Sequence, residues 1–124
     1  MAFSRKAFEE LVQQIFDSLP DQFQLHMENV RIVVEDVPSY DTLEKMRVQS
    51  SSLLGLYEGI PLNKRGTWYG MYPVVPDKIT LYKSNIERGV SNTPELREQI
   101  RHVLIHEIAH YYGMNEEEIR SAGY

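Results

Sequence analysis

The segment 93–112 constrains the fold of this chain more than any other part of the sequence. It opens with Thr93-Pro94-Glu95, which offers a capping hydroxyl, a proline suited to the first turn and a carboxylate at the positive end of the helix dipole. No lysine or arginine occurs over 103–112, which indicates a helix that is buried almost all round. Since Gly113 can take the left-handed conformation that ends a helix, we predict a central helix over 94–112.

The remaining sequence predicts a second helix and a small sheet. Apolar residues recur at helical spacing through 3–19, where Ser4 can cap the helix and Pro20 stops it. Residues 38–53 mix proline, serine and charge, which indicates a loop with room for one helical turn. Strands are predicted at 30–35, which is β-branched and suits the interior of a sheet, at 54–59, which suits an exposed edge, at 68–75 after a turn at 64–66, and at 77–82, which alternates.

These elements together predict one α+β domain over residues 1–124. We expect three layers, in which the N-terminal helix and the central helix pack on a small mixed sheet of three or four strands. A short last helix runs from Glu116 to about Ala122 with Asn115 as its cap. The chain has 124 residues, 42% hydrophobic and 25% charged, which is typical of a globular domain with its own core.

Charge and cysteine content exclude several kinds of site. The formal net charge is −5, so we expect no nucleic-acid partner, because a phosphate backbone calls for a basic surface. Cysteine is absent, which leaves His, Asp and Glu as the ligands for any metal ion. The sequence has no run long enough to span a membrane and no signal-like N-terminus, so we expect no membrane partner and a cytoplasmic protein.

The predicted central helix contains the sequence His106-Glu107-Ile-Ala-His110. Histidines four residues apart on a helix share one face, about 5–6 Å apart at Cβ, which is close enough to bind one metal ion. A glutamate between them can contact a metal-bound water without competing for the metal. We therefore interpret His106 and His110 as zinc ligands and Glu107 as a general base.

A second interpretation needs no metal. His106 and His110 could face the core and donate to backbone carbonyls, while Glu107 lies at the surface or forms a salt bridge. Three ionisable groups within five residues of an apolar helix are costly to bury unless each is paired, and one divalent cation compensates all of them. The metal interpretation is therefore favoured, although the spacing alone does not identify the metal as zinc.

A zinc site needs at least one more protein ligand. Because Gly113 lets the chain reverse, Glu116 can return toward the two histidines, and we favour it over Glu117 as the third ligand. Glu118 is assigned to a capping pair with Asn115. The competing explanation is that Glu116 and Glu117, beside this capping pair, are there only because carboxylates stabilise the first turn of a helix.

Three segments carry a resemblance to a known family, namely Leu53-Leu-Gly-Leu-Tyr-Glu-Gly-Ile-Pro61, Pro76-Asp-Lys-Ile-Thr-Leu-Tyr82 and Leu104-Ile-His-Glu-Ile-Ala-His-Tyr-Tyr-Gly113. They resemble the minimal zincin-like metallopeptidases of bacteria, which are related to peptidases with the motif HExxHxxGxxD. The resemblance covers most of the chain. It implies a minimal zincin-like fold, a bound zinc ion, His106 and His110 as ligands and Glu107 as catalytic base.

The chain departs from the family pattern at two points. The pattern has an aspartate where this chain has Glu116, and Met114 follows Gly113 too closely to form the methionine turn of larger metzincins. We expect a zinc metallopeptidase that hydrolyses short or unfolded peptides. The alternative is a catalytically weak or inactive zincin-like module that acts in binding or regulation; a metal-dependent nuclease is disfavoured by the negative charge.

Overall fold

The computed structural model describes residues 2–66 and 76–124. Its main elements, in chain order, are α1 (Arg5–Asp17), β1 (Val30–Glu35), α2 (Tyr40–Met46), β2 (Gly55–Glu58), β3 (Asp77–Tyr82), α3 (Lys83–Arg88), α4 (Thr93–Tyr112) and α5 (Glu116–Ser121). Short 3-10 turns occur at Asp21–Phe23, Ser50–Ser52 and Leu62–Lys64. The strand predicted at 68–75 lies outside the described residues. Within the described ranges, no helix is both long enough and apolar enough to span a membrane.

The described strands form one mixed sheet in the order β1-β3-β2. β1 runs parallel to β3, with Ile32 opposite Ile79, and β2 runs antiparallel to β3. The prediction that 30–35 lies inside the sheet is therefore wrong for the described part of the chain, where β1 is at an edge. The interior strand is β3, which is buried on both faces: Ile79 and Leu81 face one side, and Thr80 and Tyr82 face the other.

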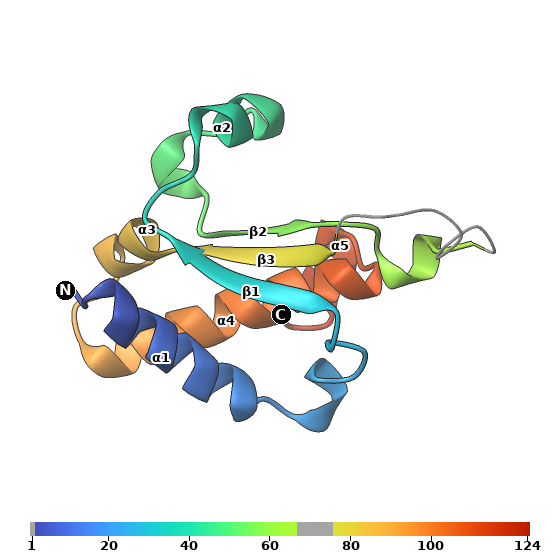
Figure 1. Cartoon of the computed structure of the whole chain (residues 1–124), viewed down its shortest axis with the longest axis horizontal. Helices are drawn as coiled ribbons and strands as arrows, with labels where there is room; N and C mark the ends of the chain where they lie inside the picture. Colours follow the sequence, from blue (N-terminus) through green and yellow to red (C-terminus); the bar gives the residue numbers. More distant parts are fainter. Residues whose placement is uncertain (1, 67–75) are drawn as a thin grey trace.

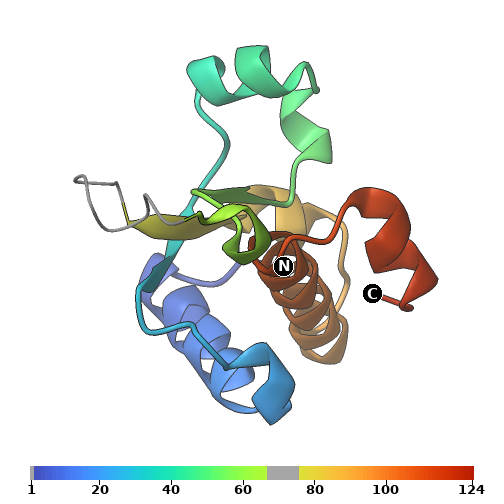
Figure 2. The ribbon, with the colours of Figure 1, turned by 90° about the vertical axis from the view of Figure 1, so that its right-hand side faces the viewer.

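Helices α1 and α4 lie side by side on the same face of the sheet (Figures 1 and 2). The expected three-layer arrangement is thus wrong, because the two helices share one layer. Their facing apolar side chains form the core together with the inner face of the sheet. The fully enclosed members include Phe8 of α1, Ile79 and Leu81 of β3, and Leu96, Ile100, Leu104 and Ile108 of α4. The α+β class, the small mixed sheet and the central helix are as predicted.

Side-chain caps fix the ends of the two long helices. The Ser4 hydroxyl accepts from the Ala7 backbone N–H at 3.1 Å, as predicted. At the start of α4 the cap is Asn92, one residue before the predicted Thr93, and its side chain accepts from the Glu95 N–H at 2.9 Å. The amide oxygen takes this role because Thr93 is already helical.

The segment 36–53, which we call the arm, contains α2 and projects from the sheet above β2 (Figures 1 and 2). The loop with one helical turn expected there is more helical than predicted, because the segment contains both α2 and the 3-10 turn at Ser50–Ser52. No residue of α2 is buried. The arm is held at its base. Asn85 of α3 donates to the backbone carbonyls of Ser50 and Leu53. The Thr42 side chain forms a hydrogen bond with the Tyr82 hydroxyl.

Candidate metal centre

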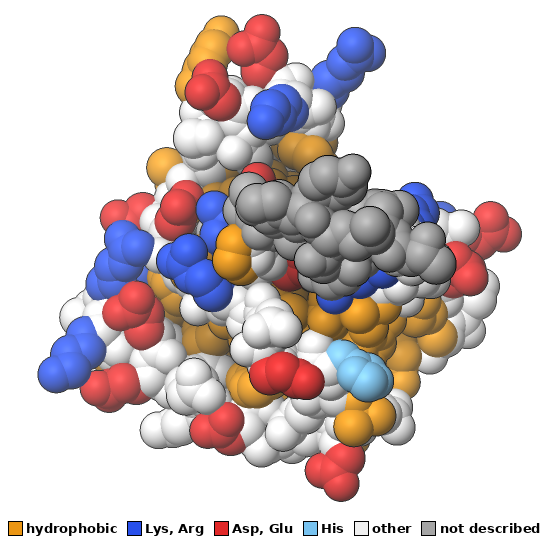
Figure 3. Space-filling model, turned by 45° about the vertical axis from the view of Figure 1, so that its right-hand side comes forward, with side chains coloured by type: hydrophobic (Ala, Val, Ile, Leu, Met, Phe, Trp, Pro, Cys, Tyr) orange, Lys and Arg blue, Asp and Glu red, His pale blue; other side chains and the backbone are white. Residues whose placement is uncertain are grey.

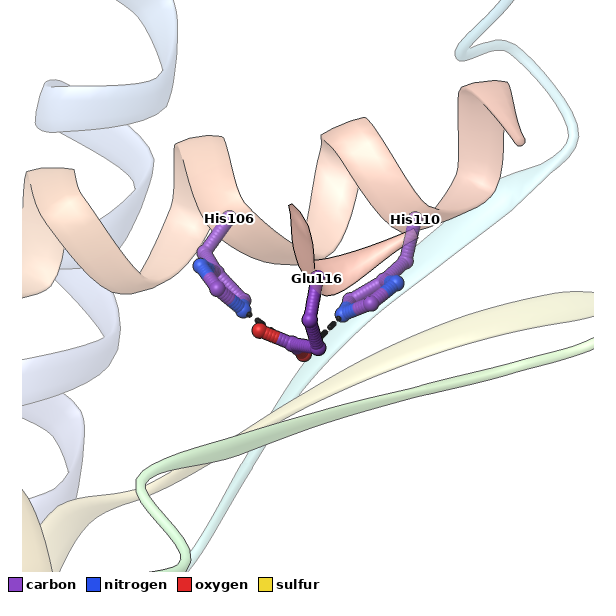
Figure 4. A group of neighbouring side chains, drawn as sticks. All are labelled: His106, His110 and Glu116. Atoms are coloured by element: carbon purple, nitrogen blue, oxygen red, sulfur yellow. Dashed lines mark hydrogen bonds and ion pairs between the residues drawn. The ribbon is translucent and has the colours of Figure 1, made fainter. Parts of the chain in front are cut away.

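His106 and His110 project from the same side of α4 toward β2 (Figure 4). They are one helical turn apart, and their ring centroids are separated by 5.1 Å with an interplanar angle of 74°. The two side chains are about a quarter exposed, at 23% and 27%, so each is largely covered by the protein. The backbone of a rigid, buried helix therefore sets the spacing of the two imidazoles.

The end of α4 turns the chain back toward these histidines. Gly113 adopts a φ of 102°, a conformation that side chains rarely take, and its N–H closes the last turn. A Cβ at this position would lie 2.2 Å from the side chain of Asn63, which packs against it. Asn115 then starts α5 through a capping box with Glu118, so Glu116 is the first residue of the new helix.

Glu116 is the carboxylate that reaches the histidines. Its Oε1 atom lies 3.1 Å from Nε2 of His106 and 2.7 Å from Nε2 of His110, and the ligand atoms of all three residues lie within 4.8 Å of one another (Figure 4). Glu117 is not part of this group, and Glu118 is engaged in the cap as predicted. The structure thus brings together the three side chains selected from the sequence.

A hydrogen bond on the far side of its ring orients His110. Its Nδ1 lies 3.1 Å from the backbone carbonyl of Met114, which can only accept. In a neutral imidazole the single proton is then on Nδ1, and Nε2 presents a lone pair toward Glu116. The Nε2 lone pair of neutral His110 and the Glu116 carboxylate repel each other, whereas both can bind one cation. This donor set of two imidazoles and a carboxylate therefore fits a zinc ion.

Glu116 is poised in its charged form. Partial burial alone would raise the pKa of this carboxyl, but when His106 and His110 are protonated their Nε2–H groups donate to it and their charges attract it, which outweighs burial and holds the pKa below its ordinary value. A deprotonated carboxylate is the form that binds a metal ion.

Glu107 points from α4 to the side facing β2 and is only 8% exposed. Burial raises the pKa of its carboxyl above the ordinary value, while His110, His106 and a hydrogen bond from the Tyr57 backbone N–H act in the opposite direction. It borders the same cleft as the two histidines. The geometry therefore supplies an oriented carboxyl beside the candidate metal ligands, with its proton affinity increased.

Glycine at position 55 allows β2 to lie this close to α4. A Cβ on Gly55 would come within 2.6 Å of Val103 and 3.3 Å of Glu107. The sequence predicts only a short edge strand at 54–59, and it predicts neither this role of Gly55 nor the hydrogen bond from the Tyr57 backbone N–H to Glu107. A glycine between apolar strand residues is a signal of close backbone approach, and it was available in the sequence.

A partly buried ion pair fixes the chain that follows β2. Arg65 forms a salt bridge with Asp77, which also accepts from the Tyr57 hydroxyl at 3.2 Å, and the Arg65 Nε donates to the Ile60 carbonyl at 2.9 Å. Burial and the Asp77 charge raise the pKa of Tyr57, so its hydroxyl remains a donor. The turn with Pro61 is thereby held beside the candidate site.

The candidate site opens into a cleft of about 730 Å³ between β2, α4 and the start of α5. The arm borders its upper rim through Met46. His102, one turn before His106, also borders the cleft; its side chain is exposed and its ring lies 6.1 Å from that of His106, outside the group of three. His26 is exposed and is not among the residues that line this cleft.

Comparison with known proteins places this geometry in a family. A family model described as zincin-like metallopeptidase matches residues 27–124, which include β1, the whole cleft and all three residues of the candidate centre. No curated protein matches the chain at a significant level.

Proposed function

The chain belongs to the zincin-like metallopeptidase family, and from this premise we propose that it is a zinc-dependent peptidase acting on short or unfolded peptides. The observation that carries the proposal is the convergence of His106 Nε2, His110 Nε2 and Glu116 Oε1 on one point beside the buried Glu107. Two neutral imidazoles and one carboxylate, with an open side toward a cleft, are the donor set of a catalytic zinc site.

In this proposal His106, His110 and Glu116 hold the metal ion. When bound, zinc lowers the pKa of a coordinated water toward about 7 and polarises the peptide carbonyl. The Met114 carbonyl keeps the His110 lone pair directed at the site. The capping box between Asn115 and Glu118 keeps Glu116 in place without taking part in binding.

Glu107 acts as the general base. Its carboxylate takes a proton from the attacking water and returns it to the leaving amine of the substrate. The raised pKa serves this role, because a more basic carboxylate accepts a proton more readily. Since only the deprotonated form is a base, kcat/KM is expected to fall as the pH drops through the pKa of Glu107.

Among the described residues β2 pairs only with β3, and its other edge offers a place for an extended peptide. The backbone N–H of Tyr82 donates to the Leu54 carbonyl at 3.0 Å, so the backbone groups of Leu54 and Leu56 point at β3. The backbone groups of Gly55 then point the other way, toward the cleft. A peptide that pairs with this edge would run past the histidines, and the strand addition requires an unfolded or short substrate.

The test is a matched pair of substitutions in the zinc-loaded protein. Glu107→Gln is expected to retain about one equivalent of zinc but to lose at least about 100-fold in the rate of casein hydrolysis after casein is denatured. Glu117→Gln makes the same chemical change at an exposed position outside the group and is expected to retain both properties. Hydrolysis at the wild-type rate by Glu107→Gln, or none by the zinc-loaded wild type, would contradict the proposal.

A further inference from the structure

Exposed apolar side chains gather on the arm. Five large hydrophobic residues are exposed in the described part of the chain. Four of them lie on the arm, in a stretch of twelve residues: Val37, Tyr40, Met46 and Val48. The surface view shows the arm standing out from the rest of the protein, with hydrophobic side chains among charged ones (Figure 3). Met46, at the end of α2, is the one of these four that borders the cleft.

The upper side of β2 continues this apolar surface. The Cβ direction of Gly55 points down at Val103 and Glu107 of α4. Because side chains alternate along a strand, Leu54 and Leu56 point to the opposite side, where the arm lies. Both are half-buried and border the same cleft as Met46. We call Met46, Leu54 and Leu56 the arm subsite.

We propose that the arm subsite determines specificity by receiving a large apolar side chain of the peptide in the cleft. This inference rests on the proposed function and identifies the class of substrate. A peptide paired with the edge of β2 presents every second side chain to the side on which Leu54 and Leu56 lie, so one such side chain meets Met46. The cleft is continuous from the arm subsite to His106 and Glu107.

The chemistry of the arm subsite favours an apolar occupant. None of its three side chains can donate a hydrogen bond or carry a charge, so a polar side chain would lose water there without compensation. Methionine is unbranched and adapts to side chains of different shape, which suits a wall that closes on one of several apolar residues. Met46 is 44% exposed, and burying it against a substrate removes apolar surface from water.

Peptide binding to a protein that cannot cleave tests the proposal. The parent is zinc-loaded Glu107→Gln, and the probes are two fluorescein-labelled decapeptides of Ala, Gly and Gln that differ in a central Leu or Ser. The Leu peptide is expected to bind about tenfold more tightly by fluorescence anisotropy. Adding Met46→Ser is expected to reduce this preference to about twofold. Equal affinities in the parent, no binding of the Leu peptide, or a preference unaffected by Met46→Ser would overturn the proposal.

Val48→Ser is the matched control. It removes an exposed apolar side chain of similar position from the same arm, but Val48 does not border the cleft. In the Glu107→Gln background it is expected to keep the tenfold preference. Loss of the preference in Val48→Ser as well as in Met46→Ser would mean that the arm acts through its fold rather than through Met46, which would overturn the proposal.

Cleavage of the same Leu decapeptide by the zinc-loaded wild type, followed by mass spectrometry, separates the two proposals. Selective binding without cleavage overturns the peptidase function and leaves the arm subsite standing. Cleavage of the Leu and Ser peptides at equal rates and with equal affinities overturns the arm subsite and leaves the peptidase function standing.

Discussion

Helices α4 and α2 border the same cleft, yet they differ in almost every physical respect. Nine residues of α4 are buried, whereas none of α2 is. Both helices are capped by a polar side chain, Asn92 in one and Ser39 in the other, so the difference lies in packing and not in local helix signals. The candidate metal ligands lie on or directly after the buried helix, and the proposed specificity residue lies on the exposed one. Positions that must be exact are thus built on the rigid core, and adaptable contacts on the arm.

The largest effect is expected in the core beneath the candidate site. Ile108 is fully buried between His106 and His110 in the sequence, and Ile108→Ala leaves a cavity on the core side of α4. We expect the free energy of unfolding of the metal-free protein to fall by about 2–5 kcal/mol, measured by urea denaturation. A loss under about 1 kcal/mol would show that α4 is less firmly packed than its burial indicates.

A smaller effect is expected where α4 ends. Gly113→Ala places a side chain at positive φ against Asn63, and we expect a loss of about 1–3 kcal/mol together with weaker zinc binding, because Glu116 follows only three residues later. Gly123→Ala is the control, since Gly123 also has positive φ, 87°, but nothing lies within 4 Å of its Cβ position. Equal losses of stability and of zinc affinity in the two variants would contradict the claim that close packing of Gly113 against Asn63 positions Glu116.

The smallest effect is expected on the arm. Tyr40 is 80% exposed on α2, and Tyr40→Ser should change the free energy of unfolding by less than about 0.5 kcal/mol. The same urea denaturation series measures it. A loss above about 1.5 kcal/mol would mean that the arm packs on another part of the protein, and the contrast between α2 and α4 would no longer hold.

Much of the fold follows from local signals in the sequence. Helical spacing and the cap at Ser4 predict α1, and the segment 103–112 without cationic residues predicts the buried part of α4. The bounds of β1 and β3 were predicted correctly, but their places in the sheet were not. The order of strands depends on where the chain crosses over after β1, and no residue within 30–35 carries that information.

In the candidate site, too, some residues could be predicted from local sequence and others depend on how distant segments pack together. The spacing in His106-Glu107-Ile-Ala-His110 is local, and Gly113 with Asn115 made Glu116 a reasonable choice, since the turn between two helices has few conformations. The contributions of Gly55 and Met46 could not be predicted from spacing. Both residues lie far before the motif in the sequence, and they meet it only because β2 packs against α4 and the arm rises over β2.

Zinc titration followed by calorimetry tests the central claim most directly. For the wild type we expect about one equivalent of zinc to bind, and Glu116→Ala should weaken binding by at least about 100-fold because it removes a ligand. Glu117→Ala, the neighbouring carboxylate outside the group, should bind zinc as the wild type does. No zinc bound by the wild type, or equal affinities of wild type and Glu116→Ala, would contradict a metal centre at His106, His110 and Glu116.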